Sequence, residues 1–462
     1  MLKEIQSKDS KILVVGLGYR TGLSTANYLI SKGYSVDVSD SKSADELISV
    51  SSQLKSGVRL FAGNQDVSLL ENGYDLIVLS PGVPAYIPLI KAAYEKNIKV
   101  IAEVELAYHF TKGSWVAITG TDGKSTTTAF TNHLMKSLGL NSREGGNIGI
   151  PLISLADDSS EDTVTVAELS SYQLETVDSF KADAAMITNL TPDHLDRYPS
   201  VEAYFDSKMN IVKNQTSSDF FVYNADDDNI RKRLDQVKSK KYSFSLKDKT
   251  ASAYYDGTHI LLNVNGRYEK VVQADRLSVL GIHNIQNCMS AILLTKAVFE
   301  KMNMSLPHNH LERFCTSFQG LHHRMEKLGI CNGRLFINDS KATTVGAVEM
   351  AVKSVNKNSV FIMGGRGKGD NYARLAEIMK DKVKGVVLIG ETADEFYGIF
   401  DGFNRAKAES LSDAADKALQ MTSDGDNIIL SPACASFDMF QSYEHRGDEF
   451  RKIYERLSSG HE

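Results

Sequence analysis

Apolar residues in this chain occur mainly in short runs that end in glycine or in polar residues, with amphipathic stretches between the runs. The run at 11–15 leads into glycines and then into a stretch that carries Leu23, Ala26 and Ile30 on one side. Such a run indicates a buried strand, and the spacing that follows it indicates a helix. Strands that alternate with helices predict an α/β fold built on parallel sheets.

This alternation occurs in three parts of the chain. A chain of 462 residues is also too long to fold around one ordinary hydrophobic core. We expect a Rossmann-like domain at 1–112, a central P-loop mononucleotide-binding α/β domain at 113–319, and a second Rossmann-like domain at 320–462. An Asp-Gly pair at 256–257 and an Asn-Gly pair at 265–266 stand between short alternating stretches, which is typical of β-hairpins. The central domain is therefore expected to carry an antiparallel flap.

The most informative stretch is 115–126, where an apolar run breaks into Gly120-Thr-Asp-Gly123-Lys124-Ser125. Two glycines let the backbone turn tightly, so that successive N–H groups and a helix N-terminus point at a polyphosphate. The lysine then meets the outer phosphates, and the serine hydroxyl binds magnesium. The loop has the short G-x-x-G-K-S form, and we expect it to bind ATP.

Polar side chains follow two later strands of the central domain. A strand at 163–167 delivers Glu168, a suitable oxygen ligand for magnesium beside a phosphate loop. A strand at 184–188 delivers a loop in which His194 stands between acidic residues, and we expect His194 to be functional. Lys208 lies farther along a helical stretch, where spacing alone predicts only a solvated lysine.

The first domain begins like a dinucleotide-binding unit, with Gly16 and Gly18 after the first strand and Asp40 after the second. Gly22 comes one residue later than in the dinucleotide fingerprint, which weakens the NAD interpretation. Gly82 follows another strand end, where ligands of open sheets gather. We interpret the domain as a nucleotide-binding module without redox chemistry; a plain α/β domain with structural glycines is the alternative.

In the third domain, each predicted strand is followed by a polar or glycine-rich turn. Because such turns meet at the carboxyl edge of a parallel sheet, they are expected to form one binding edge for a small anionic substrate. The candidate residues are Asp339, Lys341, Thr343, Lys368 and Ser436.

The bulk composition limits which binding partners and which cellular compartment can be expected. A net charge of -6 gives no reason to expect nucleic-acid binding. The N-terminus lacks the apolar core of a signal peptide, and no apolar run approaches the roughly 18 residues of a membrane helix. We therefore expect a cytoplasmic protein without membrane insertion. A monomer is also expected, although the sequence itself leaves the oligomeric state open. The four cysteines show no C-x-x-C pairing, so we expect reduced structural thiols.

These motifs resemble the Mur ligases, ATP-dependent amide-forming enzymes of bacterial cell-wall precursor synthesis. The resemblance extends over all three domains. The stretches that carry it lie in the second and third domains and are Thr119-Gly-Thr-Asp-Gly-Lys-Ser-Thr, Gly145-Gly-Asn-Ile-Gly, Glu168-Leu-Ser-Ser-Tyr-Gln-Leu-Glu, Asp193-His-Leu-Asp-Arg-Tyr, His283-Asn-Ile-Gln-Asn, Asn338-Asp-Ser-Lys-Ala-Thr and Ser431-Pro-Ala-Cys-Ala-Ser. Within the family they are most similar to the ligases that add D-glutamate to UDP-N-acetylmuramoyl-L-alanine through an acyl phosphate. That reaction belongs to peptidoglycan synthesis and so to cell shape and cell division.

The resemblance implies roles in ATP and metal binding. It places the ATP contacts at Gly120, Thr121, Asp122, Gly123, Lys124, Ser125, Thr126, Asn287, Arg324 and Asp339. It implies catalytic roles for Lys124, His194 and Lys208, and two Mg²⁺ ions held by Ser125, Glu168, His194 and Lys208. Lys208 would carry an N-carbamate, which requires a neutral amine and hence a pKa well below the usual value of about 10.4.

The resemblance also implies the substrate contacts. Asp40, Gly82 and Asn147 resemble the family's contacts to the UDP-sugar. The turn at 19–21 is one residue longer than in some relatives, which bears on how the uridine diphosphate binds. The positions that match those around D-glutamate are Lys341, Thr343, Lys368, Ser436 and Tyr443.

Other interpretations require features that this chain lacks or holds only in part. Folylpolyglutamate synthetase normally has no separate N-terminal nucleotide domain, and ligases that add diaminopimelate or lysine usually carry an Asn-Pro-Arg signature, which is absent. An NAD-dependent dehydrogenase would depend on Gly16 and Gly18 alone. A pure nucleotide switch would need an N-K-x-D motif, which is also absent.

Overall fold

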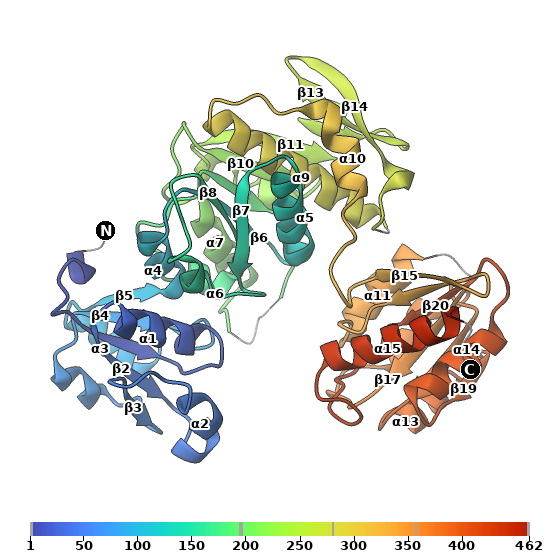
Figure 1. The fold of residues 1–462 in the computed structure, drawn as a ribbon, viewed down its shortest axis with the longest axis horizontal. Coiled ribbons are helices and arrows are strands. Elements are labelled where there is room, and N and C mark those ends of the chain that lie inside the picture. Colours follow the sequence, from blue (N-terminus) through green and yellow to red (C-terminus); the bar gives the residue numbers. More distant parts are fainter. Residues whose placement is uncertain (1–2, 194–196, 280, 356–357, 460–462) are drawn as a thin grey trace. The chain divides into compact units, whose positions relative to one another are not determined.

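A computed structural model describes residues 3–193, 197–279, 281–355 and 358–459. Within this part of the chain the strands form three sheets (Figure 1). The chain divides into two compact units, which are Met1–Gln273 with Gln286–Phe314, and Ala274–Ile285 with Cys315–Glu462. The first two sheets belong to the first unit and the third sheet to the second unit.

The first sheet is fully parallel, with the order β3-β2-β1-β4-β5. Alternate residues of β1 and β4 join apolar clusters on opposite faces of the sheet, one with α1 and α2 and the other with α3. This is the predicted Rossmann-like arrangement, and the turn after β1 lies where the strand order reverses. The strands are β1 (Lys11–Val15), β2 (Ser35–Asp40), β3 (Arg59–Ala62), β4 (Leu76–Leu79) and β5 (Lys99–Ala102), and the helices are α1 (Thr21–Ser31), α2 (Ala44–Ser51), α3 (Pro88–Glu95) and α4 (Glu103–Phe110).

The central sheet has the order β14-β13-β12-β11-β10-β9-β6-β8-β7. It is parallel from β7 to β12, whereas β12, β13 and β14 pair antiparallel and form the predicted flap. The strands are β6 (Ser114–Thr119), β7 (Asn141–Gly146), β8 (Thr163–Glu168), β9 (Ala184–Ile187), β10 (Phe220–Asn224), β11 (Lys240–Ser245), β12 (Ala253–Tyr255), β13 (His259–Val264) and β14 (Arg267–Gln273). The helices of this stretch are α5 (Lys124–Ser137), α6 (Ser171–Leu174), α7 (Val201–Met209), α8 (Asp228–Arg231), α9 (Ile282–Lys301) and α10 (Leu311–Thr316).

The third sheet has the order β15-β16-β20-β17-β18-β19, with β15 antiparallel to β16 and the other pairs parallel. One face packs against α11, α12 and α13, and the other against α14 and α15. The strands are β15 (Glu326–Cys331), β16 (Arg334–Asn338), β17 (Ser359–Gly364), β18 (Gly385–Ile389), β19 (Arg405–Lys407) and β20 (Asn427–Leu430), and the helices are α11 (Val345–Ser354), α12 (Ala373–Met379), α13 (Ala393–Ile399), α14 (Leu411–Met421) and α15 (Tyr443–Ser458).

The α/β class and its three sheet-centred parts are confirmed, and the boundaries at residues 112 and 319 stay predictions. All four cysteines are buried thiols, as expected. No helix in the described part of the chain has the length and apolar character that a membrane span requires.

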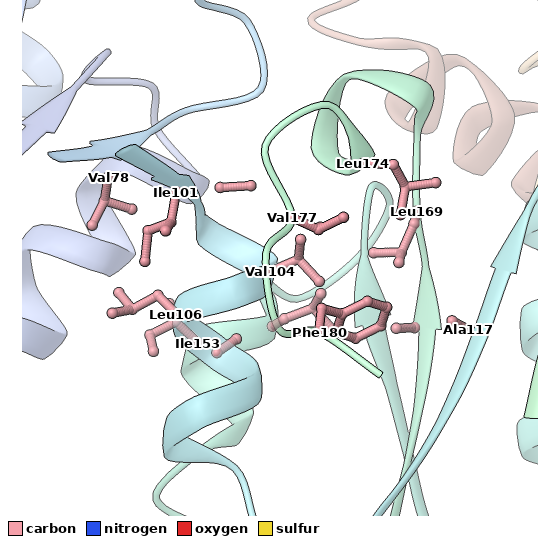
Figure 2. Close-up of a cluster of buried hydrophobic side chains, with 14 of the residues drawn as sticks. Val78, Ile101, Val104, Leu106, Ala117, Ile153, Leu169, Leu174, Val177 and Phe180 are labelled. Carbon is pink, nitrogen blue, oxygen red and sulfur yellow. The ribbon is translucent and has the colours of Figure 1, made fainter. Parts of the chain in front are cut away.

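One apolar cluster extends from the first sheet into the central sheet. Val78 of β4, Val104 of α4, Ala117 of β6 and Phe180 all lie in it, and each is almost fully buried. Figure 2 shows these side chains together, with α4 between the two sheets. Because burial of apolar surface is the main force that stabilises a fold, this shared cluster explains why both sheets form one compact unit.

A buried carboxylate also fixes α4 to the loop that precedes β9 of the central sheet. Glu105 accepts hydrogen bonds from the backbone N–H groups of Asp178, Ser179 and Phe180, each at 2.9 Å. It also pairs with His109 at 3.1 Å. Burial alone raises the pKa of Glu105, but these hydrogen bonds outweigh burial and lower the pKa to about 2.

We expect Glu105→Gln to destabilise the protein at neutral pH more than in acid. Since the folded-state pKa lies below the unfolded-state value, the carboxylate contributes stability that is present above about pH 4.3 and is lost as the pH falls toward about 2. The free energy of unfolding should drop by about 2–3 kcal/mol at about pH 7 and by roughly half as much at about pH 3, where the folded-state carboxylate is still mostly ionised. Urea unfolding at both pH values measures this, with the exposed Glu161→Gln as control. A loss of equal size at both pH values would contradict the prediction.

Candidate functional site

The phosphate loop connects β6 to α5, and its two glycines are required by the backbone. Gly120 has a φ of +140°, and a Cβ atom there would lie 1.9 Å from Thr188 Oγ1. Gly123 has a φ of +81° and precedes the first residue of α5. A residue with a side chain would therefore clash at the first position and be strained at the second, as the sequence predicted.

The loop is held by the residues that follow β9. The N–H of Asp122 donates to Asn189 Oδ1 at 2.9 Å, and the N–H of Thr121 donates to the Asn189 carbonyl at 3.0 Å. The Thr188 hydroxyl donates to the Asp122 carbonyl at 2.6 Å. These supporting roles of Thr188 and Asn189 were not predicted, although the parallel pairing of β6 with β9 brings the two strand ends together.

Two lysine side chains converge on one carbonyl of this loop. Lys124 Nζ donates to the carbonyls of Gly120 at 3.0 Å and Thr121 at 2.7 Å. Lys208 Nζ, from α7, donates to the same Gly120 carbonyl at 2.8 Å. The structure thus brings both predicted catalytic lysines to the phosphate loop.

The prediction of a solvated Lys208, made from spacing alone, was wrong. Lys208 is only 2% exposed, and its ammonium group lies 4.5 Å from the centre of the Tyr204 ring. Burial lowers the pKa of Lys208, and the nearby Lys124 charge lowers it further, to about 7, against the opposite effect of Asp193 and Asp122. A substantial fraction of this amine is therefore neutral near physiological pH.

The candidate metal ligands Ser125 and Glu168 are both buried. Glu168 ends β8, where it is the register partner of Ile118 in β6, two residues before Gly120. Its Oε1 accepts a hydrogen bond from Asn147 Nδ2 at 2.9 Å. A hydroxyl and a carboxylate beside a phosphate loop suit Mg²⁺, which prefers oxygen ligands and retains waters and phosphate oxygens.

The other candidate metal ligand, His194, and the neighbouring Asp196 lie outside the described residues. Within the residues that the structure describes, no group of three or more His, Cys, Asp or Glu side chains is arranged to hold a metal ion. Of the candidate metal ligands, the described part of the chain therefore contains Ser125, Glu168 and Lys208.

Asn287, a predicted ATP contact, lies against the phosphate loop. Its Oδ1 accepts a hydrogen bond from the Thr127 hydroxyl at 3.1 Å. A Cβ atom on Gly123 would lie 2.9 Å from the same oxygen. Helix α9 therefore places this amide next to the start of α5, where a bound nucleotide is expected. The predicted contact Thr126 is buried in the first turn of α5.

In the first domain, Asp40 uses both carboxylate oxygens on backbone groups. It accepts hydrogen bonds from the N–H of Leu17 at 2.6 Å and of Lys42 at 2.9 Å. Gly22 lies so close to β1 that a Cβ atom would be 2.0 Å from the Gly16 carbonyl. The longer glycine turn thus still ends in a close approach of helix and strand, and Asp40 shapes this turn. Gly82 follows β4 and has open space at its Cβ position.

In the third domain, Asp339 follows β16 and is buried. The Ser431 hydroxyl donates to it at 2.8 Å, and the Met325 N–H donates at 3.1 Å. Burial raises the pKa of Asp339 to about 7, although these hydrogen bonds and the charge of Arg324 act in the opposite direction. The charge of Arg324 thus acts on the buried Asp339 carboxyl group within the second compact unit.

Four of the five predicted amino-acid contacts of the third domain form two pairs of neighbouring side chains. Lys368 Nζ donates to the Thr343 hydroxyl at 2.9 Å. Lys341 Nζ lies 5.9 Å from the centre of the Tyr443 ring. Ser436 is buried in the turn that follows β20.

Arg446 organises these turns and was not predicted. It is 1% exposed and donates to the Ser340 carbonyl at 2.8 Å, to the Ser340 hydroxyl at 3.0 Å and to the Cys434 carbonyl at 3.2 Å. Since Ser340 precedes Lys341 and Cys434 precedes Ser436, Arg446 joins two of the predicted binding turns. Its position in a charged helix offered no signal for this role, because the contacts depend on how α15 packs.

A lysine-bearing glycine loop between a strand and a helix, with buried oxygen ligands nearby, defines an ATP-binding α/β enzyme. Three family models match the chain: the MurD-like N-terminal domain of Mur ligases at 10–102, the Mur ligase middle domain at 118–295, and the Mur ligase glutamate ligase domain at 323–434. The chain belongs to the Mur ligase family. The predicted ATP-dependent ligase class is thereby confirmed.

Similar proteins match along their entire length. The chain is 37% identical to the UDP-N-acetylmuramoylalanine--D-glutamate ligase of Pelotomaculum thermopropionicum, with 100% of each chain covered. It is 38% identical to the protein of the same name from Geotalea daltonii, with 99% of each covered. Among solved structures, UDP-N-acetylmuramate-alanine ligase from Thermotoga maritima has a TM-score of 0.58 at 19% identity, covering 96% of this chain and 99% of that one. This last likeness shows the shared fold.

Proposed function

We propose that this protein joins D-glutamate to UDP-N-acetylmuramoyl-L-alanine in peptidoglycan precursor synthesis, acting as a cytoplasmic monomer. The observation that carries the chemistry is the phosphate loop, where Lys124 and Lys208 meet at the Gly120 carbonyl beside buried Glu168. The full-length relatives, named for this reaction, support the choice of substrates.

The reaction needs an activated carboxylate because an amine does not displace hydroxide from a carboxylic acid in water. In the proposed first step, an oxygen of the L-alanine carboxylate attacks the γ-phosphorus of ATP, and the bond to the β-phosphate oxygen breaks. This gives an acyl phosphate and ADP. The amine of D-glutamate then attacks the acyl carbon, phosphate leaves with the electron pair of the broken C–O bond, and the amine gives up a proton.

Lys124 and the loop N–H groups are proposed to hold the ATP phosphates. Their positive charge and dipoles offset the repulsion between the carboxylate and the triphosphate, which is mainly a matter of positioning and electrostatics. Asn287 is proposed to contact the nucleotide from α9. Arg324 and Asp339 are each proposed to contact the nucleotide.

Ser125 and Glu168 are proposed to hold one Mg²⁺, and His194 and Lys208 to help hold a second. Bound magnesium would neutralise phosphate charge during the transfer. We propose that neutral Lys208 reacts with carbon dioxide, forming an N–C bond and releasing a proton. The resulting carbamate replaces a cation with oxygen donors, and the buried position and low pKa of Lys208 favour this modification.

The remaining predicted residues are proposed to hold the two other substrates. Asp40, Gly82 and Asn147 would contact the UDP-sugar. The cationic side chains of Lys341 and Lys368 would bind the two carboxylates of D-glutamate, since charge-assisted hydrogen bonds are stronger than neutral ones. Thr343, Ser436 and Tyr443 would complete that site.

Phosphate release in the presence of ATP, magnesium and UDP-N-acetylmuramoyl-L-alanine tests the proposal. The added amino acids should include D-glutamate, L-glutamate, lysine, diaminopimelate and glycine. We expect release only with D-glutamate, and none when the UDP-sugar is omitted. Preferential release with lysine or diaminopimelate would assign a different Mur-type ligation, and no release with any amino acid would contradict the proposal.

A further inference from the structure

The segment 146–153, here called the Asn147 segment, is held at both ends by charged residues from outside the central sheet. At its start, the Arg20 guanidinium donates to the carbonyls of Asn147 at 3.2 Å and Gly146 at 3.3 Å, and also to that of Gly149. At its end, Glu103 of α4 accepts a hydrogen bond from the Ile153 N–H at 2.8 Å. Contacts from the first Rossmann-like domain therefore determine where this segment lies.

Arg20 is suited to this task by its position and its chemistry. It lies in the lengthened turn after Gly18, immediately before α1, and its side chain makes no capping hydrogen bond to that helix. An arginine presents five N–H donors in a planar fork, which lets one side chain reach several carbonyls. A lysine would supply a charge at a single point and cannot reproduce this geometry.

The other side of the Asn147 segment holds Glu168. The N–H of Asn147 donates to the Glu168 carbonyl at 2.8 Å, and Asn147 Nδ2 donates to Glu168 Oε1 at 2.9 Å. Gly146 is packed so closely that a Cβ atom would lie 2.2 Å from the Glu168 carbonyl. A shift of the Asn147 segment would therefore move the carboxylate of Glu168.

We propose that Arg20 is a positioning residue that holds the Asn147 segment so that Asn147 orients the Glu168 carboxylate toward magnesium. The inference rests on the proposed function, because the metal role of Glu168 belongs to it. It connects the glycine turn of the first domain, where the UDP-sugar is expected, to a metal ligand in the central domain. Residues that orient metal ligands typically change affinity or activity about 10- to 100-fold when they are removed.

The test compares wild type, Arg20→Ala, Arg20→Lys and Lys32→Ala in the full chain. Lys32 is a matched control because it also joins α1 to the central domain, through an ion pair with Asp157, without touching the Asn147 segment. Hydrogen–deuterium exchange measures opening of residues 146–149, and electron paramagnetic resonance measures Mn²⁺ binding with a non-hydrolysable ATP analogue. Neither measurement needs turnover.

We expect Arg20→Ala to increase deuterium uptake at 146–149 and to weaken Mn²⁺ binding by about tenfold or more. Arg20→Lys should lie between Arg20→Ala and wild type, and Lys32→Ala should match wild type in both measurements. Added guanidinium ion should restore Mn²⁺ binding to Arg20→Ala, because it replaces the missing donor group.

Wild-type Mn²⁺ affinity in folded Arg20→Ala would overturn the positioning role, whether or not exchange at 146–149 increases. An equal loss in Lys32→Ala would also overturn it, because domain contacts in general would then be responsible. If the Arg20 results follow expectation but the wild type releases no phosphate with D-glutamate, the proposed substrates are wrong and the positioning role stands.

Discussion

Substitution of Lys124 by alanine is expected to lower the rate of phosphate release about a thousandfold. The Lys124 ammonium group donates hydrogen bonds to the carbonyls of Gly120 and Thr121, next to the loop N–H groups that are proposed to bind phosphate. In the variant, a carboxylate and a triphosphate would have to meet without this cation. Loss of a single preorganised group that stabilises transition-state charge typically lowers the rate by about 10²–10³-fold. Loss of a cation that contacts a transferring phosphoryl group lowers the rate by about 10³-fold or more.

The matched control is Lys136→Ala, which removes an exposed lysine from the last turn of the same helix. It should keep a rate within about twofold of wild type, because surface charges far from the reaction contribute little. The rate is measured as phosphate release at saturating ATP and UDP-sugar. Lys124→Ala with a wild-type rate would contradict the assignment of this loop as the ATP site.

The second large effect is expected for Lys208→Ala. If Lys208 acts as a carbamate, its loss removes metal-directed oxygens and should lower the rate by about a hundredfold or more. The truncation also leaves space beside the Gly120 carbonyl, where a small carboxylic acid can supply replacement oxygens. Acetate or formate should therefore restore part of the activity of Lys208→Ala and leave the wild type unchanged.

Lys213→Ala is the control for general effects of losing a lysine after α7, because Lys213 is exposed and bonds only to the Val177 carbonyl among the described residues. It should show neither the rate loss nor the response to acids. Nuclear magnetic resonance with ¹³C-labelled bicarbonate should detect a carbamate signal in wild type that disappears in Lys208→Ala. Full activity of Lys208→Ala without any response to acids would refute the modification.

The sequence predicted the strands whose apolar character is strong and missed those whose character is weak. The buried strands β1, β8 and β9 were predicted within one residue of their bounds. In contrast, no strand was predicted at β7, which ends in Gly145 and Gly146. This strand reads Asn-Ser-Arg-Glu-Gly-Gly and lies at the edge of the sheet, where an apolar pattern on both faces is not needed.

The sequence alone determined the phosphate loop, the α/β order and the turns at strand ends. These depend on local requirements, such as a positive φ at Gly123 and a close approach at Gly120, which only glycine satisfies. Only the tertiary structure decided that Lys208 is buried at Gly120, that Arg446 joins two binding turns and that Arg20 reaches the Asn147 segment. Each of these contacts joins residues far apart in the chain, and local spacing carries no information on which side chains packing will bring together.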